Sequence, residues 1–451
     1  MSLYWAPRAW LGGGWAERVL LRVGGDGQWA EVAPGVTAPA QAEVLPGPVL
    51  PGLVNAHSHA FQRAFAGLAE GRESDTDDFW SWRDRMYRVA LRITPAQLRA
   101  IAAMLYAELL RGGYTQVCEF HYLQHRPDGR PYDDRLELSW ALADAAAEAG
   151  IGLTLLPVLY QRAGFTQPAL RDDQRRFAAD SGAVRELQRG VAGASRPLLN
   201  AGVAIHSLRA AEPAAIAALL DGLGDVPVHI HAAEQTAEVD DCLQATGRRP
   251  IEWLCAHAAP DARWQLVHAT HAAPAEIAAV AQSGAGIVIC PSTEANLGDG
   301  LTDMPGWLNA GVPLAIGSDS HVTRAWPEEL RWLDYGQRLQ RRQRNVCAAP
   351  AEGLPSTAAR LLQRALHGGG RAAGFGRWGL QPGARADLLL IDTADASLLG
   401  MPEDRLLDAL VFSSPGDPFR DVMVAGRWVP RDRTAVAARF AAAMRALWNE
   451  A

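Results

Sequence analysis

The sequence predicts a TIM (β/α)8 barrel that carries a small β-sandwich domain built from the two ends of the chain. Eight short apolar runs alternate with helix-patterned segments between residues 45 and 320, which indicates repeated βα units and a parallel sheet. An open doubly wound sheet would usually have fewer strands and a Gly-rich phosphate-binding turn after the first, and this chain has no such turn. The 451 residues accommodate one barrel of roughly 250 to 350 residues and a small appendage.

The expected strands are residues 52–56, 115–120, 152–159, 202–207, 226–231, 264–268, 286–290 and 313–318. After the first strand, the segment 97–110 places Leu98, Ile101, Leu105 and Leu109 near one helical face, as an outer barrel helix requires. Segments 211–223 and 274–282 have a similar pattern. We therefore expect residues 49–375 to form the barrel.

The two ends of the chain are rich in predicted β-structure. Alternating segments with Gly and Pro turns occupy residues 3–45, and strand-like runs recur at 386–392 and 422–429. Neither end alone could bury a core, so we expect residues 1–48 and 376–430 to pair as one small sandwich. Residues 431–451 are expected to form a C-terminal helix.

The bulk composition is that of an ordinary globular protein, with 49% hydrophobic and 21% charged residues. A net charge of −7 argues against nucleic acid as the main partner, because phosphate binding needs a basic face. The sequence shows no signal peptide and no membrane-spanning run. Its five cysteines are scattered, which suits reduced thiols, so we expect a cytoplasmic protein.

Two histidines stand where the first expected strand ends, in the sequence His57-Ser58-His59. Alternation along a strand sends both imidazoles to the same side, where two neutral rings can bind one zinc ion. Such a pair alone is weak evidence, since it could equally be two polar residues at a strand end.

Metal-capable side chains also stand at three other strand ends. His231 and Glu234 follow the fifth strand, His268 ends the sixth, and Asp319 follows the eighth. Taken singly, His268 could be a core histidine and Asp319 a helix N-cap. Because barrel enzymes build their sites at the carboxyl ends of the strands, the four strands together predict one metal site.

The sequence also bears on the number of metal ions. Two-metal barrel hydrolases commonly bridge their ions with a carboxylated lysine, and this chain contains no lysine. We therefore expect one zinc ion per subunit, held by His57, His59, His231 and Asp319, with water at an open position. Iron remains an alternative to zinc.

Three motifs resemble the formimidoylglutamate deiminases, within the mononuclear deaminase branch of the amidohydrolase superfamily. They are residues 57–68 (HSHAFQRAFAGL), 79–87 (FWSWRDRMY) and 206–209 (HSLR). The flanking β segments and the Arg-rich segment 171–196 match the family only loosely. The resemblance implies a homodimer that hydrolyses N-formimino-L-glutamate to N-formyl-L-glutamate and ammonia in histidine degradation. It also implies a substrate pocket lined by Gln62, Arg83, Tyr122, His206 and Arg209.

The chemistry of this substrate supports the assignment, because it carries two carboxylates that arginine can bind with two parallel hydrogen bonds. We expect Arg83 to bind one carboxylate and Arg209 the other, in an order that stays open. Arg83 could instead be a surface residue stacked on indole. Asp319 and His268 are expected to take up and orient the proton of the attacking water, and Glu234 to pass a proton to the departing nitrogen.

Two alternatives remain at this point. The same zinc ligands would serve a deaminase of a nucleobase or another cyclic amidine, although such a pocket would favour stacking aromatics over paired arginines. A regulatory or structural protein could also keep the metal site without the chemistry, but it would have no need for Glu234 and His268 beside the metal.

Overall fold

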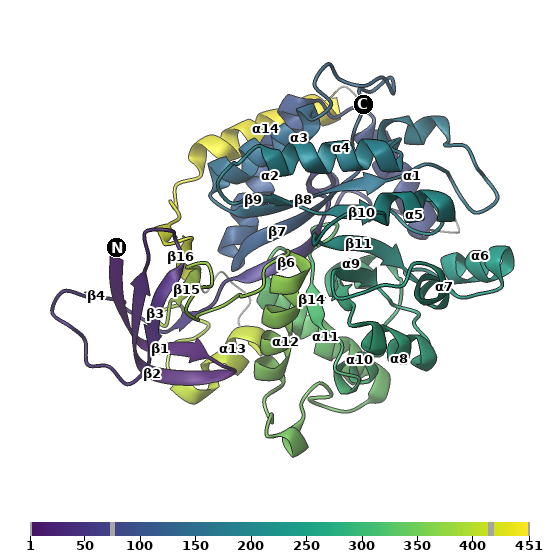
Figure 1. Ribbon diagram of the computed structural model, residues 1–451. Helices are drawn as coiled ribbons and strands as arrows, with labels where there is room; N and C mark the ends of the chain where they lie inside the picture. Colours follow the sequence, from purple (N-terminus) through teal and green to yellow (C-terminus); the bar gives the residue numbers. More distant parts are fainter. Residues whose placement is uncertain (1, 73–76, 414–418, 450–451) are drawn as a thin grey trace.

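The barrel is confirmed in the computed structural model, which describes residues 2–72, 77–413 and 419–449 (Figure 1). Its eight parallel strands are β6 (Leu53–Ser58), β7 (Tyr114–His121), β8 (Gly152–Leu159), β10 (Val203–Ile205), β11 (Val228–Ala232), β12 (Trp264–His268), β13 (Gly286–Ile289) and β14 (Leu314–Ile316). The ring closes where Ile316 of β14 pairs with Asn55 of β6, and β8 pairs directly with β10. A short strand that the sequence did not predict, β9 (Leu199–Ala201), lies beside β8.

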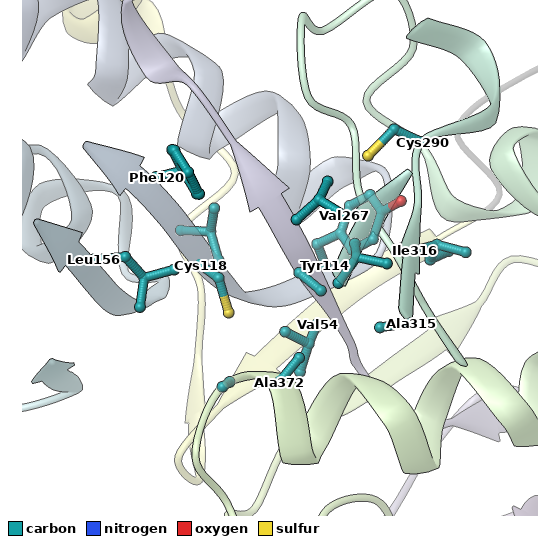
Figure 2. Close-up of a cluster of buried hydrophobic side chains, with 14 of the residues drawn as sticks. Val54, Tyr114, Cys118, Phe120, Leu156, Val267, Cys290, Ala315, Ile316 and Ala372 are labelled. Atoms are coloured by element: carbon teal, nitrogen blue, oxygen red, sulfur yellow. The ribbon is translucent and has the colours of Figure 1, made fainter. Parts of the chain in front are cut away.

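The barrel strands are buried along their whole length, which explains their continuous apolar pattern. Figure 2 shows side chains from several of them meeting in the core, among them Val54, Cys118, Leu156, Val267 and Ile316. Because the interior is filled with side chains, the open space that chemistry needs lies at the strand ends.

Helices surround the barrel and connect its strands (Figure 1). They are α1 (Phe79–Ala90), α2 (Pro95–Arg111), α3 (Glu137–Ala149), α4 (Ser181–Gly193), α5 (Pro213–Leu220), α6 (Thr236–Thr246), α7 (Pro250–His257), α8 (Pro274–Ser283), α9 (Pro291–Leu297), α10 (Met304–Asn309), α11 (Trp326–Arg341), α12 (Thr357–Ala372) and α13 (Leu406–Phe412), with 3-10 turns at Ala60–Ala64, Asp172–Phe177, Pro350–Glu352 and Glu403–Arg405. Helix α2 begins with Thr94 and Gln97 in a reciprocal capping box and Pro95 in its first turn, so its start is encoded locally.

The two ends of the chain pair as predicted, in the form of one hydrogen-bonded mixed sheet. Its strands are β1 (Ser2–Leu11), β2 (Gly14–Val23), β3 (Trp29–Ala33), β4 (Glu43–Val44), β5 (Val49–Leu50), β15 (Leu388–Ile391), β16 (Phe419–Val424) and β17 (Arg427–Trp428). Strand β5 joins the ends, because it pairs in parallel with β1 and antiparallel with β15. The sheet has its own buried cluster, whose described members lie between residues 4 and 49 and between residues 380 and 423. The domain boundaries that we placed at residues 48/49 and 375/376 stay a prediction.

The last described element, α14 (Thr434–Asn449), lies against the barrel beside α2 and α3 (Figure 1). The indole N–H of Trp448 donates to the carbonyl of Ala64 at 3.1 Å, and the guanidinium of Arg63 lies 4.9 Å from the ring centroid of Phe440. The predicted C-terminal helix is therefore present, while residues 450 and 451 lie outside the described part. Among the helices described here, none is both long and apolar enough to cross a membrane.

Candidate active site

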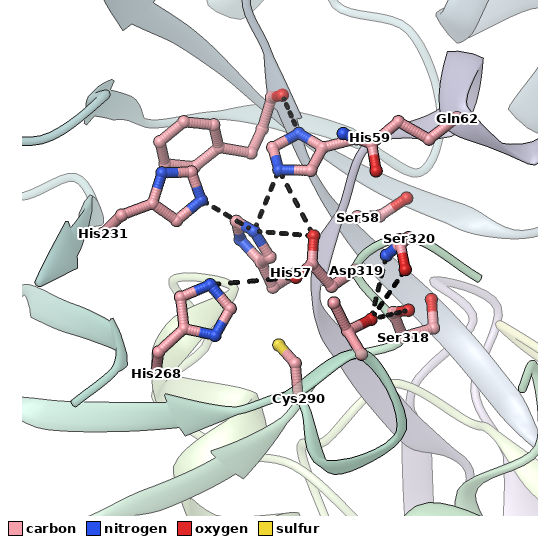
Figure 3. Close-up of polar contacts among 12 residues, drawn as sticks. His57, Ser58, His59, Gln62, His231, His268, Cys290, Ser318, Asp319 and Ser320 are labelled. Atoms are coloured by element: carbon pink, nitrogen blue, oxygen red, sulfur yellow. Dashed lines mark hydrogen bonds and ion pairs between the residues drawn. The ribbon is translucent and has the colours of Figure 1, made fainter. Parts of the chain in front are cut away.

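Four histidines and one aspartate converge at the carboxyl ends of the barrel strands (Figure 3). His57 Nε2 lies 3.1 Å from His59 Nε2 and 3.0 Å from His231 Nε2. Asp319 Oδ1 lies 3.5 Å from His57 Nε2 and 3.4 Å from His59 Nε2. His268 Nε2 completes the group, 3.7 Å from Asp319 Oδ2. The metal-capable side chains at the ends of strands β6, β11, β12 and β14 therefore meet, as the sequence predicted.

The backbone around Asp319 holds β14 close to β6. The Asp319 N–H donates to the carbonyl of His57 at 3.0 Å, and the His59 N–H donates to the carbonyl of Asp319 at 3.3 Å. A Cβ at Gly317 would lie only 2.7 Å from the Cβ of His57, so this approach needs glycine. Asp319 and His268 have φ of 45° and 69°, a left-handed backbone that costs of order 1–3 kcal/mol per residue and is concentrated at functional sites.

The imidazole nitrogens that face one another fit a cation between them. His59 donates its Nδ1–H to the carbonyl of Phe120 at 3.0 Å, and His231 donates its own to the carbonyl of His206 at 2.8 Å. Both rings therefore direct Nε2 lone pairs toward His57. Burial lowers the pKa of His57 to about 3, so this ring is neutral, which is the form that binds a metal. Three neutral nitrogens and one carboxylate suit zinc, with room for a further ligand.

His268 is held among carboxylates beside this cluster. Its Nδ1 lies 3.2 Å from Glu294 Oε1, and its Nε2 lies 3.5 Å from Glu234 Oε1. Burial lowers the pKa of His268, but the charges of Glu234, Glu294 and Asp319 outweigh it and raise that pKa well above the usual value. Burial also raises the pKa of Glu234 to about 7, which places this carboxyl close to half-ionised at neutral pH.

A cavity opens directly onto the histidine cluster. All five residues predicted to line a substrate pocket line this cavity, namely Gln62, Arg83, Tyr122, His206 and Arg209. The Gln62 amide donates to the Tyr122 hydroxyl at 3.2 Å, so these two present one polar group. Burial and the charge of Arg209 lower the pKa of His206 well below its usual value, which keeps this ring neutral.

Two guanidinium groups lie close to one indole ring beside the cavity. The Cζ of Arg83 lies 4.7 Å from the Trp80 ring centroid, and that of Arg209 lies 5.0 Å from it. Arg83 also forms an ion pair with Asp84 at 3.1 Å, yet its side chain is only 11% exposed. Arg209 Nη1 is buried and has no hydrogen-bond partner among residues 2–72, 77–413 and 419–449. Arg83 is therefore both stacked on indole and part of the cavity wall.

Several buried carboxylates that sequence reasoning missed support the site. Glu119, near the end of β7, accepts hydrogen bonds from the Ser58 hydroxyl at 2.7 Å and the Ala60 N–H at 2.5 Å, and so holds the end of β6, which carries His57, and the residues after it, which include His59. Glu294 and Glu238 contact the groups around His268 and Glu234. Glu119 and Glu294 stand close to strand ends, a signal that could have pointed to both.

Comparison with known proteins shows the family of this chain. The amidohydrolase family profile matches residues 49–429. The chain belongs to the amidohydrolase family. It is 50% identical over 434 residues to a formimidoylglutamate deiminase of Pseudomonas aeruginosa, covering 96% of this chain and 95% of that protein. The resemblance drawn from the three motifs is thus confirmed.

Two solved structures superpose on most of the chain. An amidohydrolase from Brucella melitensis has a TM-score of 0.92 at 41% identity and covers 99% of this chain and 100% of its own. A zinc-bound adenosine deaminase from Xanthomonas campestris has a TM-score of 0.80 at 25% identity, covering 99% of this chain and 98% of its own. The barrel and the end sheet are therefore both features of the family fold.

Proposed function

We propose that this chain hydrolyses the formimino group of N-formimino-L-glutamate, releasing ammonia and N-formyl-L-glutamate, as part of histidine degradation. One observation carries the proposal: a single cavity has a metal-ligand cluster at its base and two arginines, Arg83 and Arg209, in its wall. The 50% identity to the formimidoylglutamate deiminase of P. aeruginosa supports it.

The metal in this proposal is a single zinc ion bound by His57, His59, His231 and Asp319. The neutral rings and the facing Nε2 lone pairs support such a ligand set. The relative from X. campestris is described with bound zinc. When bound, the metal supplies Lewis acidity that activates water near neutral pH. Metal analysis of the purified protein distinguishes zinc from iron and one ion from two.

The arginines bind and orient the substrate. Arg83 and Arg209 each take one carboxylate, because a guanidinium matches the planar carboxylate with two parallel hydrogen bonds. The Tyr122 hydroxyl and the Gln62 amide add neutral hydrogen bonds, and the neutral His206 ring contributes one more. With the carboxylates fixed at the outer end, the formimino carbon is held near the histidine cluster.

The remaining residues move protons. Asp319 accepts the proton that water loses as its oxygen bonds to the formimino carbon, and His268, 3.7 Å from Asp319, orients it. Glu234 starts as the carboxylate, hydrogen-bonds the terminal nitrogen of the substrate, takes over the proton released by water and passes it to that nitrogen. The carbon–nitrogen bond then breaks, ammonia leaves, and the carbon keeps the oxygen as a formyl group. A pKa of about 7 suits Glu234 to both accepting and donating this proton.

Ammonia release measured side by side on N-formimino-L-glutamate, guanine and cytosine tests this proposal against the alternatives. We expect turnover of the first compound only. Preferential turnover of a nucleobase would favour the cyclic-amidine deaminase instead. Bound zinc without activity on any amidine would indicate a protein that keeps the site for regulation or structure.

Two further features concern assembly and location. The resemblance to the family suggests a homodimer, which light scattering on the purified protein tests. The five cysteines, all without a disulfide partner in the described part of the chain, support a cytoplasmic location.

A further inference from the structure

Glu238 is a buried carboxylate in the wall of the active-site cavity with one oxygen that no described residue explains. It lies in the first turn of α6, and only 6% of the residue is exposed. Its Oε2 accepts a hydrogen bond from the backbone N–H of Glu234 at 3.0 Å. Its Oε1 is also buried and has no hydrogen-bond partner within the three described stretches of chain.

The first oxygen has a structural role and the second does not. By accepting from the Glu234 N–H, Oε2 fixes the short loop that joins β11 to α6, where Ala233 has a left-handed φ of 53°. A glutamine would fill that role equally well through its carbonyl oxygen. A buried carboxylate oxygen left unpaired is costly, which indicates that its partner comes from outside the chain.

The surroundings of Glu238 indicate which chemistry that partner has. The same wall carries Glu234 and Arg209. Burial raises the pKa of Glu238, and the charge of Arg209 partly offsets this rise. A carboxylate oxygen beside a second carboxyl group favours a cationic N–H donor. A carboxylate of the ligand would be repelled there and is better placed on the arginines.

We propose that Glu238 binds the substrate directly, accepting a hydrogen bond from the internal N–H of the formimino group while Glu234 contacts the terminal nitrogen. This inference rests on the proposed function. A formimino group attached to nitrogen is an amidine, which is protonated and cationic at neutral pH, whereas the formyl group of the product is a neutral amide. Glu238 therefore makes the site prefer the substrate over its own product.

Glu238→Gln tests this, because it keeps the oxygen that accepts from the Glu234 N–H and removes only the charge. We expect kcat/KM for N-formimino-L-glutamate to fall about tenfold to a hundredfold, since a charge-assisted hydrogen bond is lost. The inhibition constant of N-formyl-L-glutamate should change less than about threefold, because the product has no cationic group. A purely structural role would not produce this difference between substrate and product.

Glu252→Gln is the matched control. Glu252 occupies the corresponding first-turn position of α7, reaches back to the Arg249 N–H, and does not line the cavity. This variant should keep wild-type kinetics. A Glu238→Gln enzyme with unchanged kcat/KM, or with equal loss of affinity for substrate and product, would overturn the inference.

The wild-type enzyme is assayed first, which separates the two proposals. Absence of turnover of N-formimino-L-glutamate by the wild type refutes the proposed function, whereas normal turnover with an unaffected Glu238→Gln variant refutes only the role of Glu238. If Glu238→Gln does not fold, Glu238→Asp tests the role of Glu238 through the same two quantities, kcat/KM for the substrate and the inhibition constant of N-formyl-L-glutamate. Its shorter carboxylate withdraws from the cavity, so a selective loss on the substrate supports the role and an equal loss on both compounds overturns it.

Discussion

Replacement of Arg209 by methionine should weaken the capture of a substrate carboxylate while leaving the fold intact. Methionine keeps much of the volume that packs beside Trp80 and removes the guanidinium, whose Nη1 is buried and lacks a partner within the described residues. Because this buried N–H group lies in the cavity wall, a ligand carboxylate is a natural partner for it.

The magnitude follows from the burial of the pair. Removing one partner of a buried, hydrogen-bonded charge pair costs about 2–5 kcal/mol. Arg209 is half-buried, so the lower part of that range applies, about 2–3 kcal/mol. At about 1.4 kcal/mol per factor of ten, kcat/KM for N-formimino-L-glutamate should fall roughly 30- to 150-fold.

The assay combines the enzyme variant with altered substrates. Wild-type enzyme and Arg209→Met are compared on N-formimino-L-glutamate and on its two mono-amides, in which the side-chain or the α-carboxylate is neutral. On one mono-amide, Arg209→Met and wild type should have the same kcat/KM. The carboxylate that is neutralised in that compound is the one that Arg209 binds. Arg189→Met, on the outer helix α4, is the control and should behave as wild type. An unchanged kcat/KM for Arg209→Met, or an equal loss on all three compounds, would refute the role.

The other predictions concern proton transfer and the metal. Glu234→Gln and His268→Asn should each lower kcat by about 10²- to 10⁴-fold while the protein stays folded, and near-normal turnover would remove either residue from the mechanism. Burial raises the pKa of Glu234 to about 7, so its ionised carboxylate is lost as the pH falls below 7. We therefore expect kcat/KM to decline toward acid with an apparent pKa near 7. A flat profile between pH 5.5 and 8 would contradict this. Glu294→Ala leaves the ring N–H of His268 and the backbone N–H of Cys290 without their acceptor. We expect kcat to fall about 10- to 100-fold and Tm to drop. Unchanged kcat and unchanged Tm would show that Glu294 does not position His268. Removing the metal with a chelator should abolish activity and lower Tm, with one equivalent of zinc restoring both, and a chelator-treated enzyme of unchanged activity would contradict the metal site.

The sequence alone was sufficient to predict the eight strands and the strand ends on which His57, His231, His268 and Asp319 stand. This was possible because an apolar run buried on both faces has a pattern of its own, and because every parallel strand of a barrel ends at the same rim. Convergence of the four residues then follows from the fold class without knowledge of any loop. The pairing of the chain ends was predictable for a similar reason, since neither end could bury a core alone.

The tertiary structure decided the contacts that depend on how loops and helices return to this rim. Glu294 reaches His268 because α9 follows directly after β13, and Trp80 lies close to two arginines because α1 lines the cavity. The free oxygen of Glu238 and the left-handed backbone of Asp319 likewise have no periodic signature. Such contacts join side chains of no fixed spacing, and their partners are set by packing and by the need to satisfy buried polar groups, which only the folded chain resolves.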